Sequence, residues 1–224
     1  MDMRFVLIGL LLLASASAAS AESGSPADAV HDALLETAIA RPALPPGNAT
    51  GWIETRRTLT GGSEPEVKTS RANPSKEPAK AFASYSELKD IIGPDAHVIE
   101  RVGSRTTYAF TTRHIPKSPT QVGDVKVSMD GRVEDALFDG MAVVLTDATG
   151  QPYVGQLDLR MRKAAGNWFV RVKHIDISYK FGPAAPGTAI AANAMSVDVD
   201  VRAALFVHRA VHTDSMLVAS SETP

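Results

Sequence analysis

The residues with the clearest chemical potential lie in the last third of the chain, where histidines and aspartates alternate with apolar residues. In the stretch "NWFVRVKHIDISYKF" (167–181), His174 and Asp176 are two positions apart. Residues with this spacing share one face of a strand, so an imidazole and a carboxylate could together orient a general base. The sequence contains no G-x-S-x-G nucleophile motif to accompany them. The pair is therefore more typical of a solvated strand face, and an enzyme using His174 and Asp176 is kept as an alternative.

Two further pairs follow along the chain. His208 and His212 have the i, i+4 spacing that places two metal ligands on one face of a helix. Their surroundings alternate as in a strand, which separates them by about 13 Å, too far for one ion. Asp198 and Asp200 could act as a glycosidase-like carboxylate pair, but alternating acids on an exposed strand usually protect an edge and keep it soluble. We expect no metal ion and no cofactor.

The strand that carries His174 has a fault in its alternation. Trp168, Val170 and Val172 place apolar groups on one face, and the apolar positions then change parity from Ile175 onward. An extra residue near Lys173–His174 would form a β-bulge, which bends a strand and changes its phase. We expect the first half of the strand to line the concave side of a curved sheet and the second half to cover a helix or an edge. Two separate strands with a register break remain the alternative.

The rest of the chain predicts a mainly β protein with a strongly curved antiparallel sheet, a half-open barrel. Short strands joined by tight turns favour a meander over βαβ units. One helix is expected to begin at Ser25–Pro26, and a short capping helix at the capping box of Ser84 and Glu87. We expect an N-terminal helix and proline-rich connector at 22–50, a single sheet domain at 51–212 with a loop at 182–193 and a last strand at 195–212, and a flexible tail at 213–224. An α+β cone of the NTF2-like kind is the alternative fold.

The first residues indicate export. Arg4 precedes the apolar run "FVLIGLLLLA" (5–14), which is too short to span a bilayer, and Ala19-Ser20-Ala21 fits a cleavage site. We interpret 1–21 as a signal peptide cleaved near Ala21, with an N-terminal membrane anchor as the alternative, and expect no integral membrane protein. The chain has no cysteine and a net charge of −2, which argue against disulfides and nucleic-acid binding. We therefore expect a bacterial protein that is periplasmic or secreted.

A set of apolar residues on the central strands is predicted to line a ligand cavity. A curved sheet can leave space between its concave side and the helices that cover it. An ordinary filled core is the alternative for each residue. The predicted ligand-binding residues are Phe110, Phe138, Met141, Val143, Leu157, Leu159, Met161 and Trp168.

Four features occur together along the chain: the expected signal peptide, the stretch "GWIETRRTLTG", the Ser-Glu-Leu of the short helix and the long strands that follow. Over about 51–212, this layout resembles the half-barrel lipoprotein-carrier class of periplasmic proteins. The resemblance implies a hydrophobic cavity that accepts acyl chains. We therefore expect a non-enzymatic protein that binds a lipid, an acyl chain or an acylated or apolar segment of an envelope protein. The alternatives are the small NTF2-like enzyme and an interaction module of the cell envelope.

Overall fold

The computed structural model describes residues 32–62, 64–116, 121–122, 125–126, 137–166, 170–184, 189–203 and 207–219. Its strands are β1 (Trp52–Thr60), β2 (Glu66–Ala72), β3 (His97–Val102), β4 (Arg105–Thr112), β5 (Gln121–Val122), β6 (Val125–Lys126), β7 (Phe138–Thr146), β8 (Pro152–Met161), β9 (Ala165–Gly166), β10 (Val170–Pro183), β11 (Ile190–Ala203) and β12 (Val207–Val218).

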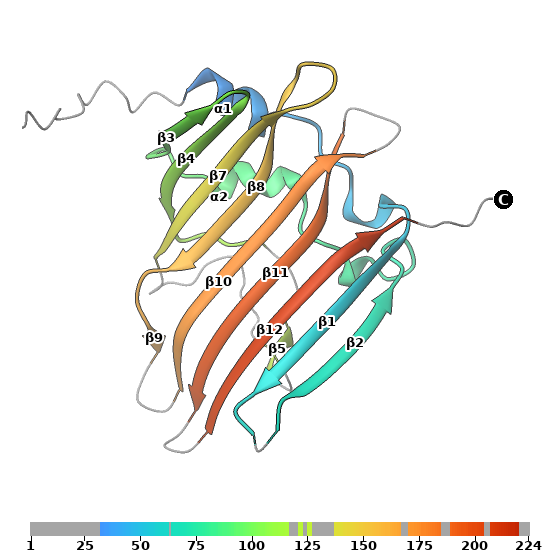
Figure 1. The fold of residues 1–224 in the computed structure, drawn as a ribbon, viewed down its shortest axis with the longest axis vertical. Coiled ribbons are helices and arrows are strands. Elements are labelled where there is room, and N and C mark those ends of the chain that lie inside the picture. The colour runs from blue at the N-terminus through green and yellow to red at the C-terminus, as the bar shows by residue number, and fades with distance from the viewer. Residues whose placement is uncertain are drawn as a thin grey trace, which may run out of the picture.

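One antiparallel sheet of ten strands dominates the protein, in the order β2-β1-β12-β11-β10-β8-β7-β4-β3, with β9 paired to β10 (Figure 1). The sheet is curved and does not close, which confirms the mainly β fold with an open, curved antiparallel sheet. Strands β5 and β6 form a separate two-stranded sheet. The first hairpin, β1–β2, joins the sheet beside the last strand β12, so the first and last strands of the described chain are direct neighbours.

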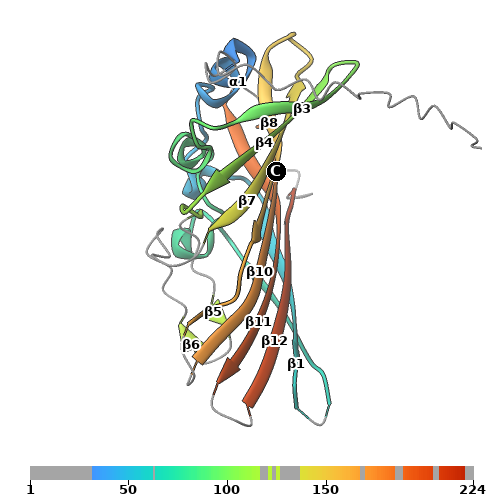
Figure 2. The same ribbon diagram turned by 90° about the vertical axis from the view of Figure 1, so that its left-hand side faces the viewer.

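The helical segments lie on one side of the sheet (Figure 2). They are α1 (Ala33–Ile39), α2 (Leu88–Ile91) and the 3₁₀ turns η2 (Pro46–Asn48), η3 (Pro78–Lys80) and η4 (Tyr85–Glu87). We call the side that they cover the inner face, and the opposite side the outer face. None of the described helices has the length and apolar character needed to cross a membrane.

The hydrophobic core lies between the helices and the inner face. Leu157 and Tyr179 from neighbouring strands are buried there with Tyr85 of η4 and Leu35 of α1. The ring of Tyr85 meets that of Phe181 edge to face, with centroids 5.3 Å apart. Burying such side chains contributes roughly 1.5–3 kcal/mol each. The core therefore fixes which face of each strand turns inward.

Helix α1 is held by polar contacts at both ends. Asp32 caps it by accepting a hydrogen bond from the Leu34 amide at 3.1 Å, and the Tyr108 hydroxyl donates to the same carboxylate at 3.0 Å. These hydrogen bonds, with the Arg101 guanidinium, lower the pKa of Asp32 against the opposing effect of burial. The helix start predicted at Ser25–Pro26 and the signal peptide predicted at 1–21 both lie outside the described residues.

The far end of α1 is joined to the β7–β8 hairpin. The Tyr85 hydroxyl donates to the Ala38 carbonyl at 2.7 Å and accepts from the Val154 amide at 2.8 Å, and burial raises its pKa to about 12. Arg41 forms an ion pair of 2.9 Å with Asp147, and both side chains are buried. The predicted capping box of Ser84 and Glu87 is present at the start of η4.

The bulge predicted in β10 is confirmed. The register of β10 against β11 shifts between Val172 and His174, so Lys173 is the extra residue. The expectation that the two halves of the strand serve different sides is wrong, because Val172 packs on the core and Ile175 is buried in it. The bulge compensates the parity change and keeps the apolar residues on the inner face.

Three expectations for the C-terminal region are also wrong. The loop predicted at 182–193 is shorter, since β10 reaches Pro183 and β11 begins at Ile190, which is fully buried. The single last strand predicted at 195–212 is two strands, β11 and β12, that pair as a hairpin. The tail predicted from 213 is strand as far as Val218, because β12 lies between β1 and β11.

Candidate ligand-binding groove

Most of the residues predicted to line a cavity lie in the packed core. Phe110, Phe138, Leu157, Leu159 and Met161 belong to the core cluster, and each is at most 6% exposed. Met141 and Val143 alternate with inward-facing residues and belong to the outer face; Met141 is 36% exposed, whereas Val143 is buried. The side chain of Trp168 lies outside the described residues. The structure thus brings five of the eight together beneath the helices.

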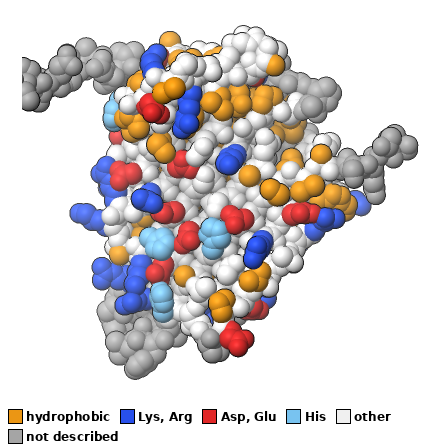
Figure 3. All heavy atoms as spheres, viewed as in Figure 1, with side chains coloured by type: hydrophobic (Ala, Val, Ile, Leu, Met, Phe, Trp, Pro, Cys, Tyr) orange, Lys and Arg blue, Asp and Glu red, His pale blue; other side chains and the backbone are white. Residues whose placement is uncertain are grey.

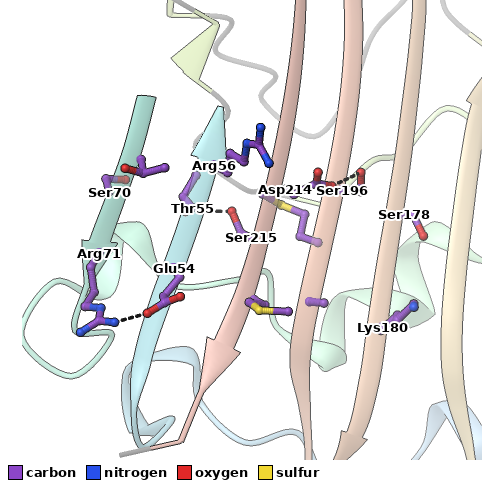
Figure 4. A pocket seen from close by; sticks show the side chains of 14 residues that line it. Glu54, Thr55, Arg56, Ser70, Arg71, Ser178, Lys180, Ser196, Asp214 and Ser215 are labelled. Carbon is purple, nitrogen blue, oxygen red and sulfur yellow. Dashed lines mark hydrogen bonds and ion pairs between the residues drawn. The ribbon is translucent and has the colours of Figure 1, made fainter. Parts of the chain in front are cut away.

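A groove lies elsewhere, on the outer face, and none of these eight residues lines it. Two rows of cross-strand partners form its walls and floor. The first row is Lys180, Ala194, Met216, Glu54 and Arg71, and the second is Ser178, Ser196, Asp214, Arg56 and Thr69. The intervening residues Thr55, Ser70, Met195 and Ser215 complete the lining (Figure 4).

The dimensions of the groove suit an elongated molecule. Its volume is about 670 Å³, within the usual range for small-molecule sites. Each row crosses from β10 to β2, a path of about 19 Å at ~4.8 Å between neighbouring strands. The floor is low where Ala194, Ser178 and Ser196 present small side chains, and Met216 rises beside them with 56% of its surface exposed.

Most charges in the groove already have partners. Glu54 forms an ion pair with Arg71, and Asp214 accepts a hydrogen bond from the Ser196 hydroxyl at 2.8 Å. Arg56 and Lys180 form no ion pair within the described part of the chain. With Arg71, Arg56 and Lys180 against Glu54 and Asp214, the lining carries three positive and two negative charges, a surplus of one positive charge.

Beside the groove, the outer face carries a chain of histidines and aspartates, visible in the middle of Figure 3. His174 contacts Asp198 at 2.8 Å, and His212 contacts Asp198 at 3.2 Å and Asp214 at 2.9 Å. We call these four residues the histidine–aspartate chain. Ionised carboxylates only accept hydrogen bonds, so each contact needs a proton on the ring nitrogen that makes it.

In the sheet, the histidine and aspartate residues that were paired by their spacing in the sequence contact other residues instead. His174 bonds to Asp198 on the next strand, while Asp176 forms an ion pair of 3.4 Å with Arg160. His208 bonds to Asp200 at 2.7 Å, so the two histidines of β12 have different partners and lie on a polar strand face, as predicted. Within the described residues, no three His, Cys, Asp or Glu side chains are placed to hold a metal ion. Neither His174 nor Asp176 lines the groove, and their catalytic role stays a prediction.

None of the residues that line the groove is among the predicted ligand-binding residues. The common signal of the lining residues is the small or hydroxyl side chains Ser178, Ala194 and Ser196 at outward positions of long strands, where charged residues are more usual. That signal becomes readable only once the register of the strands is known.

Comparisons of the chain with protein-family models, with curated proteins and with solved structures give no match.

Proposed function

We propose that the protein binds an elongated, partly apolar ligand such as an acyl chain in the outer-face groove. The observation that carries the proposal is the groove itself, a hollow of about 670 Å³ across five strands with a floor of small side chains and an exposed methionine. The unbranched, polarisable methionine side chain adapts to flexible apolar partners. This keeps the ligand class expected from the sequence and moves its site from the inner to the outer face.

Close-packed side chains fill the inner face, and this favours the outer-face groove as the ligand site. Leu157, Phe138 and Tyr179 are at most 1% exposed and occupy the space in which a ligand was expected. A ligand there would have to displace close-packed side chains, which costs more than entering a preformed groove. The outer-face groove needs no such rearrangement.

The proposal includes export of the chain by its N-terminal 21 residues and action in the cell envelope or outside the cell. Acyl chains are abundant at that location in membrane lipids and lipoproteins. The ligand proposed here is a free amphiphile, with the acylated segment of a partner protein as the second source of the same chemistry.

Native mass spectrometry of the protein purified without detergent tests the proposal. A preparation unfolded in urea, washed and refolded provides the ligand-free reference. We expect a mass excess over the reference that solvent extraction recovers as a lipid or fatty acid, or that the reference regains when incubated with a fatty acid. A folded protein that shows no excess and takes up no acyl ligand would contradict the proposal.

A further inference from the structure

We propose that the groove selects amphiphiles with a single anionic head group, and that Lys180 anchors that head group. This inference rests on the proposed function and adds the chemical class and orientation of the ligand. The head would lie at the β10 end of the groove, with the apolar tail crossing Ala194 and Met216 toward β1 and β2.

The cations of the groove differ in how far their charge is compensated. Arg71 is paired with Glu54. Arg56 has no ion pair among the described residues, but its direct cross-strand partner on β12 is Asp214. A carboxylate directly opposite on the neighbouring strand offsets part of the positive potential at Arg56.

Lys180 has neutral neighbours on both adjacent strands. Its cross-strand partners are Ala194 on β11 and Gln156 on β8, and Ser178 precedes it on the same face. The nearest carboxylate on β8, Asp158, accepts hydrogen bonds from Ser178 at 2.6 Å and from Gln156 at 2.7 Å. The positive potential of the groove is therefore greatest at Lys180, which is where an anionic head group is most stable.

The apolar part of the groove cannot supply strong binding by itself. About ten half-buried methylene groups of an acyl chain correspond to a Kd near 1 mM. An ion pair with an exposed lysine strengthens such binding by up to about five-fold. The small floor at Ala194 and Ser196 leaves the Lys180 ammonium accessible from the groove.

The test compares dodecanoic acid with dodecan-1-ol, both below the concentration at which they aggregate, by displacement of a fluorescent probe. The variants are Lys180→Gln, Lys180→Glu and Arg56→Gln, with Lys163→Gln as a control at an exposed turn remote from the groove. We expect the wild type to prefer the acid, Lys180→Gln to weaken the acid about three- to five-fold and the alcohol not at all, and Lys180→Glu to weaken the acid about ten-fold. Arg56→Gln should have a smaller effect, and Lys163→Gln none.

The outcomes separate this inference from the proposed function. Equal binding of acid and alcohol, unaffected by Lys180→Gln, would overturn the head-group inference and leave the groove as a ligand site. A full loss of acid preference in Arg56→Gln with none in Lys180→Gln would overturn the assignment to Lys180. Binding of neither ligand contradicts both, as does sedimentation of the protein with phosphatidylglycerol vesicles without binding of dissolved acid.

Discussion

The two faces of the sheet are formed by the same strands but differ in burial and in the kind of contact that their side chains make. On the inner face, Leu157, Ile177 and Val197 pack beneath the helices and are at most 8% exposed. On the outer face, the residues between them, such as Asp158 and Ser178, hydrogen-bond to one another across strands. The inner face therefore contributes most of the buried apolar area, whereas the outer face presents polar groups that bond to one another.

One extra residue keeps the two faces separate over a long strand. Strand β10 runs from Val170 to Pro183, and without Lys173 its inward and outward residues would exchange places halfway. The bulge also lets Lys173 approach Asp200 on the outer face, at 3.9 Å. The bulge therefore keeps the apolar residues on the inner face and the polar residues on the outer face along the whole strand.

The largest expected difference between the faces is in stability. Leu157→Ala removes a fully buried side chain and should lower the free energy of unfolding by about 2–5 kcal/mol. Met216→Ala, on the exposed outer face, should change it by less than about 0.5 kcal/mol. Urea unfolding followed by circular dichroism measures both, and similar losses would contradict the assignment of the faces.

A smaller loss of stability is expected at Gly140, where a core side chain packs directly against the backbone. A Cβ added to Gly140 would lie 2.2 Å from the Phe110 ring, so Gly140→Ala should cost about 1–3 kcal/mol as the ring shifts. Combining it with Phe110→Leu should cost less than the sum of the two changes. The control is Gly62→Ala, whose nearest neighbour would be 3.8 Å away. Strict additivity would show that the ring does not lie over Gly140.

The carboxylate of Asp147 in the β7–β8 turn should make the stability of the protein depend on pH. Hydrogen bonds from the Thr149 hydroxyl and the Gln151 amide, with the Arg41 guanidinium, hold the pKa of Asp147 well below its usual range. A carboxyl whose pKa is lower in the folded state stabilises the protein above the unfolded pKa of about 3.9 and loses that effect as the pH falls. The melting temperature of Asp147→Asn should therefore lie below that of the wild type at pH 7, with a gap that narrows toward pH 2.

The control for Asp147 is Asp139→Asn, which breaks the solvent-exposed ion pair with Arg162. Its melting temperature at pH 7 should differ little from that of the wild type. A gap for Asp147→Asn that stays constant with pH would contradict the role of the charge.

The smallest effect is expected in the histidine–aspartate chain. His212→Gln removes two contacts at a half-exposed position and should change the free energy of unfolding by less than about 1 kcal/mol. A double-mutant cycle with Asp198→Asn measures the coupling between the two residues. A coupling of several kcal/mol would mean that contacts on the outer face also contribute substantially to the free energy of unfolding.

Much of the fold follows from local patterns in the sequence. The bulge could be predicted because the parity of apolar residues changes between Val172 and Ile175, and the hairpins because tight turns separate alternating runs. The division of the C-terminal region into β11 and β12 could not be predicted, because "ALF" (204–206) between them continues the apolar alternation and contains no glycine or proline. The extra hairpin in turn places β12 beside β1, which no local pattern encodes.

The candidate site depends on information of a different kind. Lys180, Ala194 and Glu54 become neighbours only through the register of non-adjacent segments. The apolar pattern identified Phe110 and Leu159 as inward-facing, but periodicity does not distinguish a residue that fills a core from one that lines a cavity. Residue types alone therefore led to the inner face.

The most direct test of the central claim is to change the space available on each face separately and to measure the binding of a fluorescent fatty acid by titration. Ala194→Phe fills the floor of the groove, Thr58→Phe places the same ring on β1 outside the groove lining, and Phe110→Ala opens space in the core. We predict that Ala194→Phe abolishes binding, whereas Thr58→Phe and Phe110→Ala, each verified as folded, retain it. Binding that survives in Ala194→Phe and changes in Phe110→Ala would contradict this account and place the ligand beneath the helices.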